Sequence, residues 1–228
     1  MPLVNVFSRT ADHQKELEEI IELLERHERT VNEKRLRDAY ELALQIHGKQ
    51  KRKDGSPYIV HPLAVAKTCA EHWMTDVAVA SALLHDTLED ADEEFGLTEE
   101  VMVRRFGPEV AHIVSGVTKF EKSLAGEGED YRVETLKKLL HVTALEDIRI
   151  IILKIFDRHH NATSLSVFRE EKRRRIGEET MRFYVPMADR LGFYGVARAM
   201  EDSVLKALQP SRHKELTRWI ERERKKKA

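Results

Sequence analysis

The sequence predicts an all-α fold of many helices. Amphipathic stripes with helical spacing recur along the chain, cap signals precede several of them, and strand signals are almost absent. At 228 residues, the chain is long enough to bury a sizeable core in one domain with an additional helical arm. We therefore expect a helical domain with an N-terminal helical arm.

The first helices follow from stripe and cap signals. Between residues 14 and 26, the apolar residues form one stripe among charged ones, as in an amphipathic helix. Thr30 and Glu33 have the spacing of a capping box, so a second helix is expected from about residue 31 to His47, ending at Gly48. A basic, turn-rich loop follows, and Pro62 suits the first residue of the next helix.

Later helices are marked in the same way. Asp76 can cap a helix over residues 77–89, and Thr98 can cap the helix that begins at Glu99. Residues 148–156 are rich in β-branched side chains and fit a strand, but they also fit a buried helix. Hydrophobic periodicity does not separate these two alternatives.

Composition narrows the expected partners and location. The chain has 39 Lys and Arg residues against 40 Asp and Glu residues, which gives a formal net charge of −1, so we expect neither nucleic acid nor membrane as a partner. Cys69 is the single cysteine and lies in an Ala- and Val-rich segment, which favours a buried thiol. A lone cysteine and the lack of a long apolar run favour a cytoplasmic protein.

Four residues in the order His, His-Asp, Asp predict a metal site: His61, His85, Asp86 and Asp157. Imidazole nitrogen together with carboxylate oxygen suits a divalent ion such as Mn, Fe, Co or Zn, with positions left open for water and phosphate. Such an ion promotes phosphoester hydrolysis by activating water and neutralising phosphate charge. The sequence therefore predicts a metal-dependent phosphohydrolase.

Two further acids, Glu89 and Asp90, follow the His-Asp pair. On a continuous helix, Glu89 would lie beside both His85 and Asp86, and Asp90 beside Asp86. Three carboxylates within five residues repel one another unless a cation or solvent separates them. The alternative interpretation is a surface helix end whose acids face solvent.

The segment around Asp157 carries further polar residues. If it is helical, Lys154, Asp157, Asn161 and Ser164 share one stripe. Asn161 and Ser164 have donors and acceptors that can bind a base or a sugar, and Lys154 would place an ammonium group at the edge of the stripe. The alternative, an exposed polar face, conflicts with the apolar residues that precede Lys154.

The basic loop adds two candidates for substrate binding. Arg52 lies nine residues before His61, and its planar guanidinium can stack on a base or bind phosphate. Lys53 adds a point charge beside it. A solvated turn is the alternative for each of these residues.

Six segments in order along the chain resemble the hydrolase domain of RelA/SpoT alarmone enzymes, which belong to the His-Asp (HD) phosphohydrolase superfamily. These segments are residues 55–62, 82–90, 106–110, 116–119, 157–161 and 190–192. The resemblance runs from about residue 36 to residue 210. Because no nucleotidyltransferase domain or regulatory tail follows, the chain is similar to a stand-alone small alarmone hydrolase.

This resemblance implies an HD-type helical fold, a Mn²⁺ ion, and removal of the 3′-pyrophosphate from guanosine 3′,5′-bis(diphosphate) (ppGpp) or its pentaphosphate relative (pppGpp). It implies that Glu89 and Asp90 are a catalytic pair acting on the attacking water. The implied metal ligands are His61, His85, Asp86 and Asp157, and the implied substrate-binding residues include Arg52, Lys53, Asn161 and Ser164. The family usually has threonine in place of Ser164, which retains the hydroxyl.

Two other functions remain possible for a chain with this pattern of residues. A His-Asp phosphatase acting on an adenosine alarmone or NADPH is one rival, and a catalytically silent nucleotide-binding module is another. The acids Glu89 and Asp90 argue against the silent module, because such a module would be free to lose them.

The expected domain division is a helical arm over residues 1–30, the HD-type domain over 31–210, and a C-terminal helix with a basic tail over 211–228. Self-association into a homo-oligomer is the one role expected for the arm.

Overall fold

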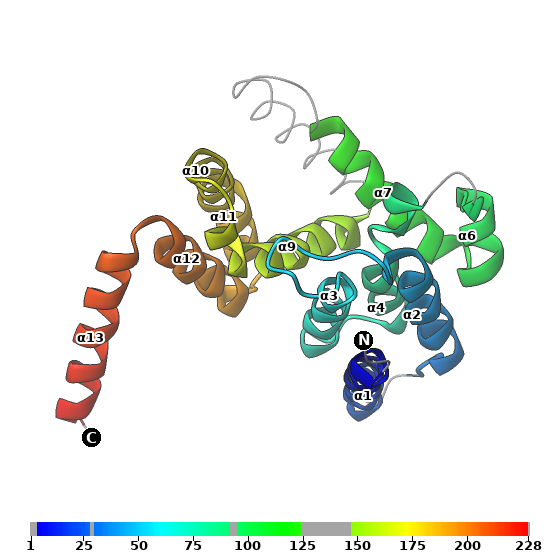
Figure 1. Ribbon diagram of the computed structural model, residues 1–228, viewed down its shortest axis with the longest axis horizontal. Coiled ribbons are helices and arrows are strands. Elements are labelled where there is room, and N and C mark those ends of the chain that lie inside the picture. The colour runs from blue at the N-terminus through cyan, green and yellow to red at the C-terminus, as the bar shows by residue number, and fades with distance from the viewer. Residues whose placement is uncertain (1–3, 28–29, 92–94, 125–146, 228) are drawn as a thin grey trace. The chain divides into compact units, whose positions relative to one another are not determined.

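The computed structural model describes residues 4–27, 30–91, 95–124 and 147–227 (Figure 1). Within these ranges the chain is helical, and its only β-type pairing is a single bridge between Lys51 and Pro57. The prediction of an all-α fold is therefore confirmed. The chain divides into two compact units, residues 1–154 and residues 155–228. The three-part division predicted from the sequence stays a prediction.

The first unit is built around α4 (Asp76–Leu84), which packs against α2 (Glu33–His47), α3 (Val60–Glu71) and α7 (Pro108–Leu124) (Figure 1). Every residue from Ala78 to Leu84 is buried. A helix that is apolar on all sides is stable only inside a protein, so its neighbours must enclose it. As a consequence, His85, the residue that follows the C-terminal end of α4, is also buried.

The remaining helices of this unit cover the central group. They are α1 (Val4–Arg26), α5 (Thr87–Asp90), α6 (Glu99–Phe106) and the first turns of α9 (Ile148–Thr163). The predicted stripe of α1 is confirmed, because Leu17, Ile20, Ile21 and Leu24 are buried and α1 packs against α3 and α2. Ion pairs from Glu18 to Arg37 and from Glu19 to Lys67 hold α1 to these two helices at its rim.

Two predicted helix caps are wrong by one or two residues. Asn32 caps α2 in place of Thr30, because its Oδ1 accepts a hydrogen bond of 3.0 Å from the backbone N–H of Arg35. Asp76 is the first residue of α4, and its carboxylate instead accepts bonds from the Asn32 N–H and the Arg35 side chain. Thr75 takes over the cap of α4. The cap at Thr98 is confirmed.

The predicted continuous helix over residues 77–89 is wrong, because α4 ends at Leu84 and α5 begins at Thr87. Side chains form hydrogen bonds with carbonyl oxygens that would accept from backbone N–H groups in a longer helix. His85 Nδ1 lies 2.8 Å from the Ala82 carbonyl oxygen, and Thr87 Oγ1 donates to the Leu84 carbonyl at 2.7 Å. Such local side-chain bonds compete with helical backbone bonds and end the helix.

The ambiguous segment over residues 148–156 forms the first part of α9 and is therefore helical. Ile150, Ile151, Leu153, Ile155 and Phe156 are buried. Burial on more than one face explains why the β-branched residues did not produce a simple amphipathic pattern.

The second unit comprises the end of α9 and the helical segments that follow it. These are η2 (Leu165–Val167), α10 (Glu170–Glu179), η3 (Thr180–Tyr184), α11 (Val185–Arg190), α12 (Tyr194–Leu208) and α13 (Pro210–Lys227). Arg158 of α9 donates to Glu179 Oε1 at 2.6 Å, and its guanidinium lies over the Tyr184 ring at 4.4 Å. This pairing connects α9 to α10 and η3, because the half-buried guanidinium of Arg158 is stabilised by the Glu179 carboxylate and the Tyr184 ring.

Two expectations from composition concern Cys69 and membranes. Cys69 is fully buried, as predicted, and burial raises the pKa of its thiol far above the ordinary value. None of the described helices combines the length and the apolar character that a bilayer crossing requires. The expected cytoplasmic location stays a prediction.

Gly107, between α6 and α7, provides a test of the fold. Its backbone has φ 92° and ψ 164°, a region that residues with a Cβ atom avoid. Gly107→Ala should lower the free energy of unfolding by about 1–3 kcal/mol, measured by urea denaturation. Gly195→Ala is the control, because Gly195 lies in α12 with open space where an added Cβ atom would lie and no positive φ. Equal stability of the two variants would contradict the predicted strain at Gly107.

Candidate metal centre

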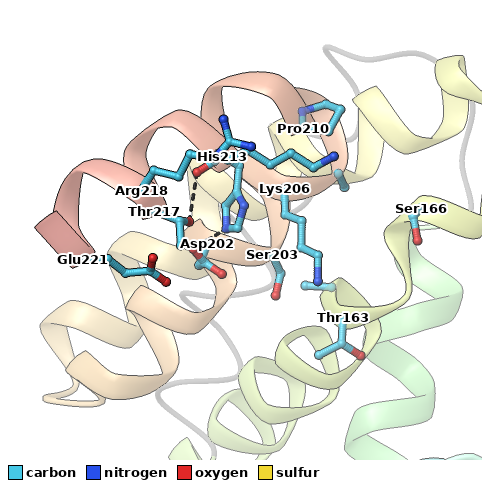
Figure 2. A pocket seen from close by; sticks show the side chains of 13 residues that line it. Thr163, Ser166, Asp202, Ser203, Lys206, Pro210, His213, Thr217, Arg218 and Glu221 are labelled. Atoms are coloured by element: carbon cyan, nitrogen blue, oxygen red, sulfur yellow. Dashed lines mark hydrogen bonds and ion pairs between the residues drawn. The ribbon is translucent and has the colours of Figure 1, made fainter.

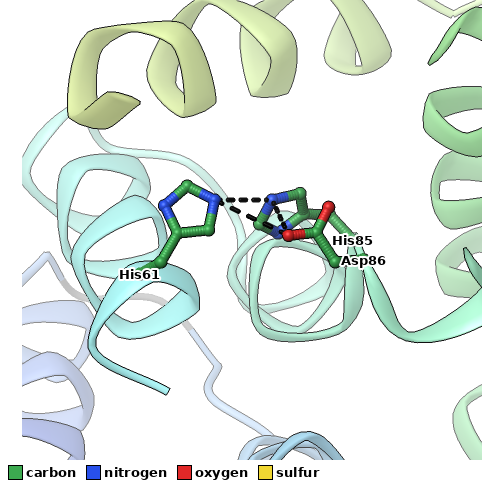
Figure 3. Close-up of side chains that lie close together, drawn as sticks. All are labelled: His61, His85 and Asp86. Carbon is green, nitrogen blue, oxygen red and sulfur yellow. Dashed lines mark hydrogen bonds and ion pairs between the residues drawn. The ribbon is translucent and has the colours of Figure 1, made fainter. Parts of the chain in front are cut away.

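The structure brings three of the four predicted ligands together (Figure 3). His61 lies in the first turn of α3, whereas His85 and Asp86 form the turn after α4. His85 Nε2 lies 3.2 Å from His61 Nε2 and 3.2 Å from Asp86 Oδ2, and His61 Nε2 lies 3.7 Å from Asp86 Oδ2. His61 and His85 are 2% and 1% exposed. Three donor atoms thus form a compact triangle with two buried corners.

The dimensions of this triangle fit a shared divalent ion. Two ligand atoms that each lie about 2.1 Å from one ion, at angles between a right angle and about 120°, are about 3.0–3.7 Å apart. The backbone carbonyl of Ala82 can only accept a hydrogen bond, so His85 Nδ1 must carry the proton that it shares with that oxygen. A ring with its one proton on Nδ1 has its lone pair on Nε2, the atom that faces His61 and Asp86.

Tyr58 supports this cluster, and our sequence analysis did not assign it a role. Its hydroxyl donates a hydrogen bond of 2.6 Å to Asp86 Oδ2, and its ring contacts His61 edge-on. Hydrogen bonds to a ligating carboxylate fix its orientation and are a regular part of metal sites. The sequence signal that could have identified Tyr58 is its position three residues before His61, inside the segment 55–62.

Glu89 and Asp90 lie on α5, directly after the His-Asp pair. The helix break does not separate them from Asp86, because the backbone N–H of Asp90 donates to the Asp86 carbonyl at 3.0 Å. Glu89 is exposed and Asp90 is half-buried. Burial and the nearby Asp86 charge raise the pKa of Asp90 above its ordinary value, although His47 and Gln50 oppose this shift. A carboxylate with a raised pKa is better suited to exchanging a proton with water.

Arg52 and Lys53 lie in the turn between α2 and α3. The backbone N–H of Arg52 donates to the Ser56 carbonyl at 2.8 Å, and the Gly55 N–H donates to the Arg52 carbonyl at 2.9 Å. Gly55 has φ 87°, which favours glycine at this position. The backbone that carries the half-buried Arg52 is therefore fixed at both ends, while its role in substrate binding stays a prediction.

The remaining candidates lie on or just after α9. Lys154 and Asp157 are buried. Asn161 Nδ2 donates to Asp157 Oδ1 at 2.6 Å, so these two residues share a helix face as predicted. Ser164 follows the last residue of α9, and its hydroxyl donates to the Asn161 carbonyl at 3.2 Å. Asp157 belongs to the second unit, so its part in the metal site stays a prediction.

A pocket of about 720 Å³ lies within the second unit, between the end of α9, α12 and α13 (Figure 2). His213 Nε2 lies 2.9 Å from Asp202 Oδ1, and Thr217 donates to the His213 carbonyl at 2.9 Å. Charged residues of both signs line it, including Lys206, Lys214, Asp202 and Glu221. None of the predicted site residues is among its lining residues.

An all-α chain in which a His-Asp pair follows a buried helix and meets a second histidine has the features of a histidine–aspartate metalloprotein. The chain belongs to the HD domain family, which matches residues 39–194. The matched residues include all four predicted metal ligands and both acids of α5.

Curated relatives are similar to most of this chain. It is 45% identical over 187 residues to the guanosine-3′,5′-bis(diphosphate) 3′-pyrophosphohydrolase of Aquifex aeolicus, a match that covers 82% of this chain and 26% of the relative. It is 39% identical over 181 residues to the bifunctional (p)ppGpp synthase/hydrolase SpoT of Escherichia coli, covering 79% and 25%. For the GTP pyrophosphokinase rsh of Brucella abortus, identity is 38% over 199 residues, covering 87% and 26%.

The chain thus spans about a quarter of the length of these relatives. The match confirms the predicted resemblance to the hydrolase domain of RelA/SpoT enzymes.

Removing a donor from the triangle should weaken metal binding without unfolding the protein. Asp86→Asn replaces a charged ligand with a neutral amide, so the affinity for Mn²⁺, measured by titration calorimetry, should fall by at least about 100-fold. Asp54→Asn is the matched control, because Asp54 is exposed and an amide oxygen can still accept its bond from Ser56 N–H. Unchanged affinity in Asp86→Asn would remove Asp86 from the metal site.

Proposed function

We propose that this chain hydrolyses the 3′-pyrophosphate of ppGpp or pppGpp and releases pyrophosphate with GDP or GTP. The observation that carries this proposal is the triangle of His61, His85 and Asp86 within the region matched by the HD domain family. The names of two relatives support the choice of substrate, since they describe a 3′-pyrophosphohydrolase and a (p)ppGpp synthase/hydrolase.

The donor set supports a divalent ion, and we propose Mn²⁺, with Asp157 as a further ligand. Two imidazole nitrogens and a carboxylate suit Mn as well as Fe, Co and Zn. A divalent ion bound here would lower the pKa of water and offset charge on the phosphate. The contribution of the chain is to hold the donors in place, through the bond from His85 to Ala82 and the bond from Tyr58 to Asp86.

Glu89 and Asp90 are proposed to act on the attacking water, with Asp90 accepting its proton and Glu89 orienting it. The raised pKa of Asp90 favours its accepting a proton as the water oxygen approaches phosphorus. The water oxygen forms a bond to the phosphorus attached at O3′, and the bond between that phosphorus and O3′ breaks. Pyrophosphate leaves, and O3′ takes up a proton to become the 3′-hydroxyl. Glu89, exposed beside Asp90, can orient the same water.

The nucleoside is proposed to be held by Arg52, Asn161 and Ser164, and the phosphates by Lys53 and Lys154. A guanidinium can stack on a base while its N–H groups still donate hydrogen bonds in the plane of the group. The fixed backbone at Arg52 supports this role, because it limits the positions that the side chain can reach.

A product assay over a panel of nucleotides tests the substrate. With Mn²⁺ present, the protein should release pyrophosphate and GDP from ppGpp, detected by anion-exchange chromatography, because a divalent ion at the triangle supports water attack on the 3′-linked phosphorus. The adenosine counterpart and NADPH serve as comparison substrates. Cleavage of either one alone would contradict the guanosine assignment, and binding of all three without cleavage would contradict an enzymatic function.

The stacking role of Arg52 predicts a specific kinetic effect. Base stacking is worth about 1–3 kcal/mol, so Arg52→Ala should raise the KM for ppGpp by roughly 5- to 150-fold. The effect on kcat should be smaller, because ground and transition states share the contact. Lys51→Ala is the control, since Lys51 is exposed in the same turn. Equal KM values for the two variants would contradict base stacking by Arg52.

A further inference from the structure

His47 is a buried histidine that none of the preceding roles uses. It is the last residue of α2 and is 1% exposed. Its Nδ1 atom lies 3.0 Å from Gln50 Oε1 and 3.5 Å from Asp90 Oδ2. Burying an imidazole costs free energy unless its polar atoms are bonded, so the contacts of Nδ1 offset part of that cost. They also join the end of α2 to one of the two acids of α5.

Gln50 is the second member of this group, and its backbone is held on both sides. Its N–H donates to the His47 carbonyl at 2.9 Å, and its carbonyl accepts from the Tyr58 N–H at 3.1 Å. Its side-chain amide forms a hydrogen bond with Asp90. The amide of Gln50 therefore contacts both the imidazole of His47 and the carboxylate of Asp90.

The chemistry of these groups fixes the direction of the hydrogen bonds. A carboxylate only accepts, so the Gln50 amide nitrogen donates to Asp90 and its oxygen is left to face His47. Both atoms near His47 Nδ1, Gln50 Oε1 and Asp90 Oδ2, are then acceptors, so Nδ1 must carry a proton. His47 Nε2 has no hydrogen-bond partner among the described residues, which is consistent with a proton on Nδ1. The chain of donors runs from His47 through Gln50 to Asp90.

Asp90 needs support from outside its own helix. It is the last residue of α5, a helix of four residues, and the next residue, Ala91, is extended. Its half-buried carboxylate lies near the charge of Asp86, which repels it. A single helical turn does not restrain the side chain at its end, so donors from another element determine where the carboxylate points. His47 is the deeply buried donor of this group, and the Tyr58 ring packs against it at 4.7 Å.

We propose that His47 and Gln50 form a buried hydrogen-bond chain that positions the Asp90 carboxylate for proton transfer. His47 is thus a positioning residue and does not contact the substrate. This inference rests on the proposed function, because it assigns the chain to the hydrolytic role of Asp90.

Steady-state kinetics with Mn²⁺ and ppGpp test the positioning role. His47→Phe keeps an aromatic ring but removes the donor, so kcat should fall by about 10- to 100-fold while KM changes little and the Mn²⁺ content is unchanged. His47→Asn places an amide nitrogen near the position of Nδ1 and should recover most of the loss. Asp90→Asn sets the lower limit of activity. His72→Phe is the matched control, because His72 Nδ1 likewise contacts an acceptor oxygen, the Thr68 carbonyl at 2.8 Å, but His72 follows the last residue of α3, at the opposite end of that helix from His61.

A merely structural role would give a different pattern. An unchanged kcat in His47→Phe, or equal losses in the Phe and Asn variants, would overturn the proposal. Gln50→Leu breaks the chain without changing the buried ring and should lower kcat to the same extent as His47→Phe. It keeps the test decisive if His47→Phe fails to fold.

Nuclear magnetic resonance gives a readout that does not depend on activity. In protein labelled with ¹⁵N-histidine, His47, assigned by its absence in His47→Phe, should be protonated at Nδ1, and Gln50→Leu should change this pattern. A neutral His47 protonated at Nε2 would overturn the chain. If the unmutated protein cleaves none of the tested nucleotides, the proposed function fails, whereas the tautomer of His47 still decides whether the hydrogen-bond chain exists.

Discussion

The burial of α4 is the constraint on which the metal centre depends. Its apolar residues from Ala78 to Leu84 are enclosed by α2, α3 and α7, so the chain must leave this helix inside the unit. His85 and Asp86 are the first residues after the helix end, and the first turn of α3 supplies His61. Two buried imidazoles and a carboxylate within 3.7 Å are costly to desolvate, and a bound cation would offset that cost.

Hydrogen bonds from side chains surround the triangle and determine what each donor can do. The Ala82 carbonyl sets the tautomer of His85, and the Tyr58 hydroxyl orients Asp86. The same bonds that end α4 also create the turn in which the His-Asp pair lies. The local break in the helix is therefore part of the site, because a continuous helix would carry His85 and Asp86 in a different orientation. The bond from His85 to the Ala82 carbonyl therefore has two effects. It satisfies a backbone oxygen at the end of α4, and it orients the ring of a proposed metal ligand.

The sequence was informative where a local pattern determines structure. Apolar periodicity predicted α1, the cap signal at Thr98 predicted the start of α6, and residue chemistry predicted the grouping of His61, His85 and Asp86. It failed where partners distant in sequence decide the outcome. The carboxylate of Asp76 accepts a hydrogen bond from the N–H of Asn32, 44 residues away, and the caps of α2 and α4 are Asn32 and Thr75 instead of the predicted residues. The side-chain bonds of His85 and Thr87 end α4 before the predicted position. No role was assigned to Tyr58 or His47 from the sequence, because the acids that they contact, Asp86 and Asp90, lie on other elements.

The central claim is that the triangle of His61, His85 and Asp86 holds a divalent ion, and anomalous X-ray diffraction from crystals grown with Mn²⁺ tests it most directly. The account predicts an anomalous peak about 2.0–2.3 Å from His61 Nε2, His85 Nε2 and Asp86 Oδ2. An ordered Mn²⁺ ion bound elsewhere, with no peak between these three atoms, would contradict it.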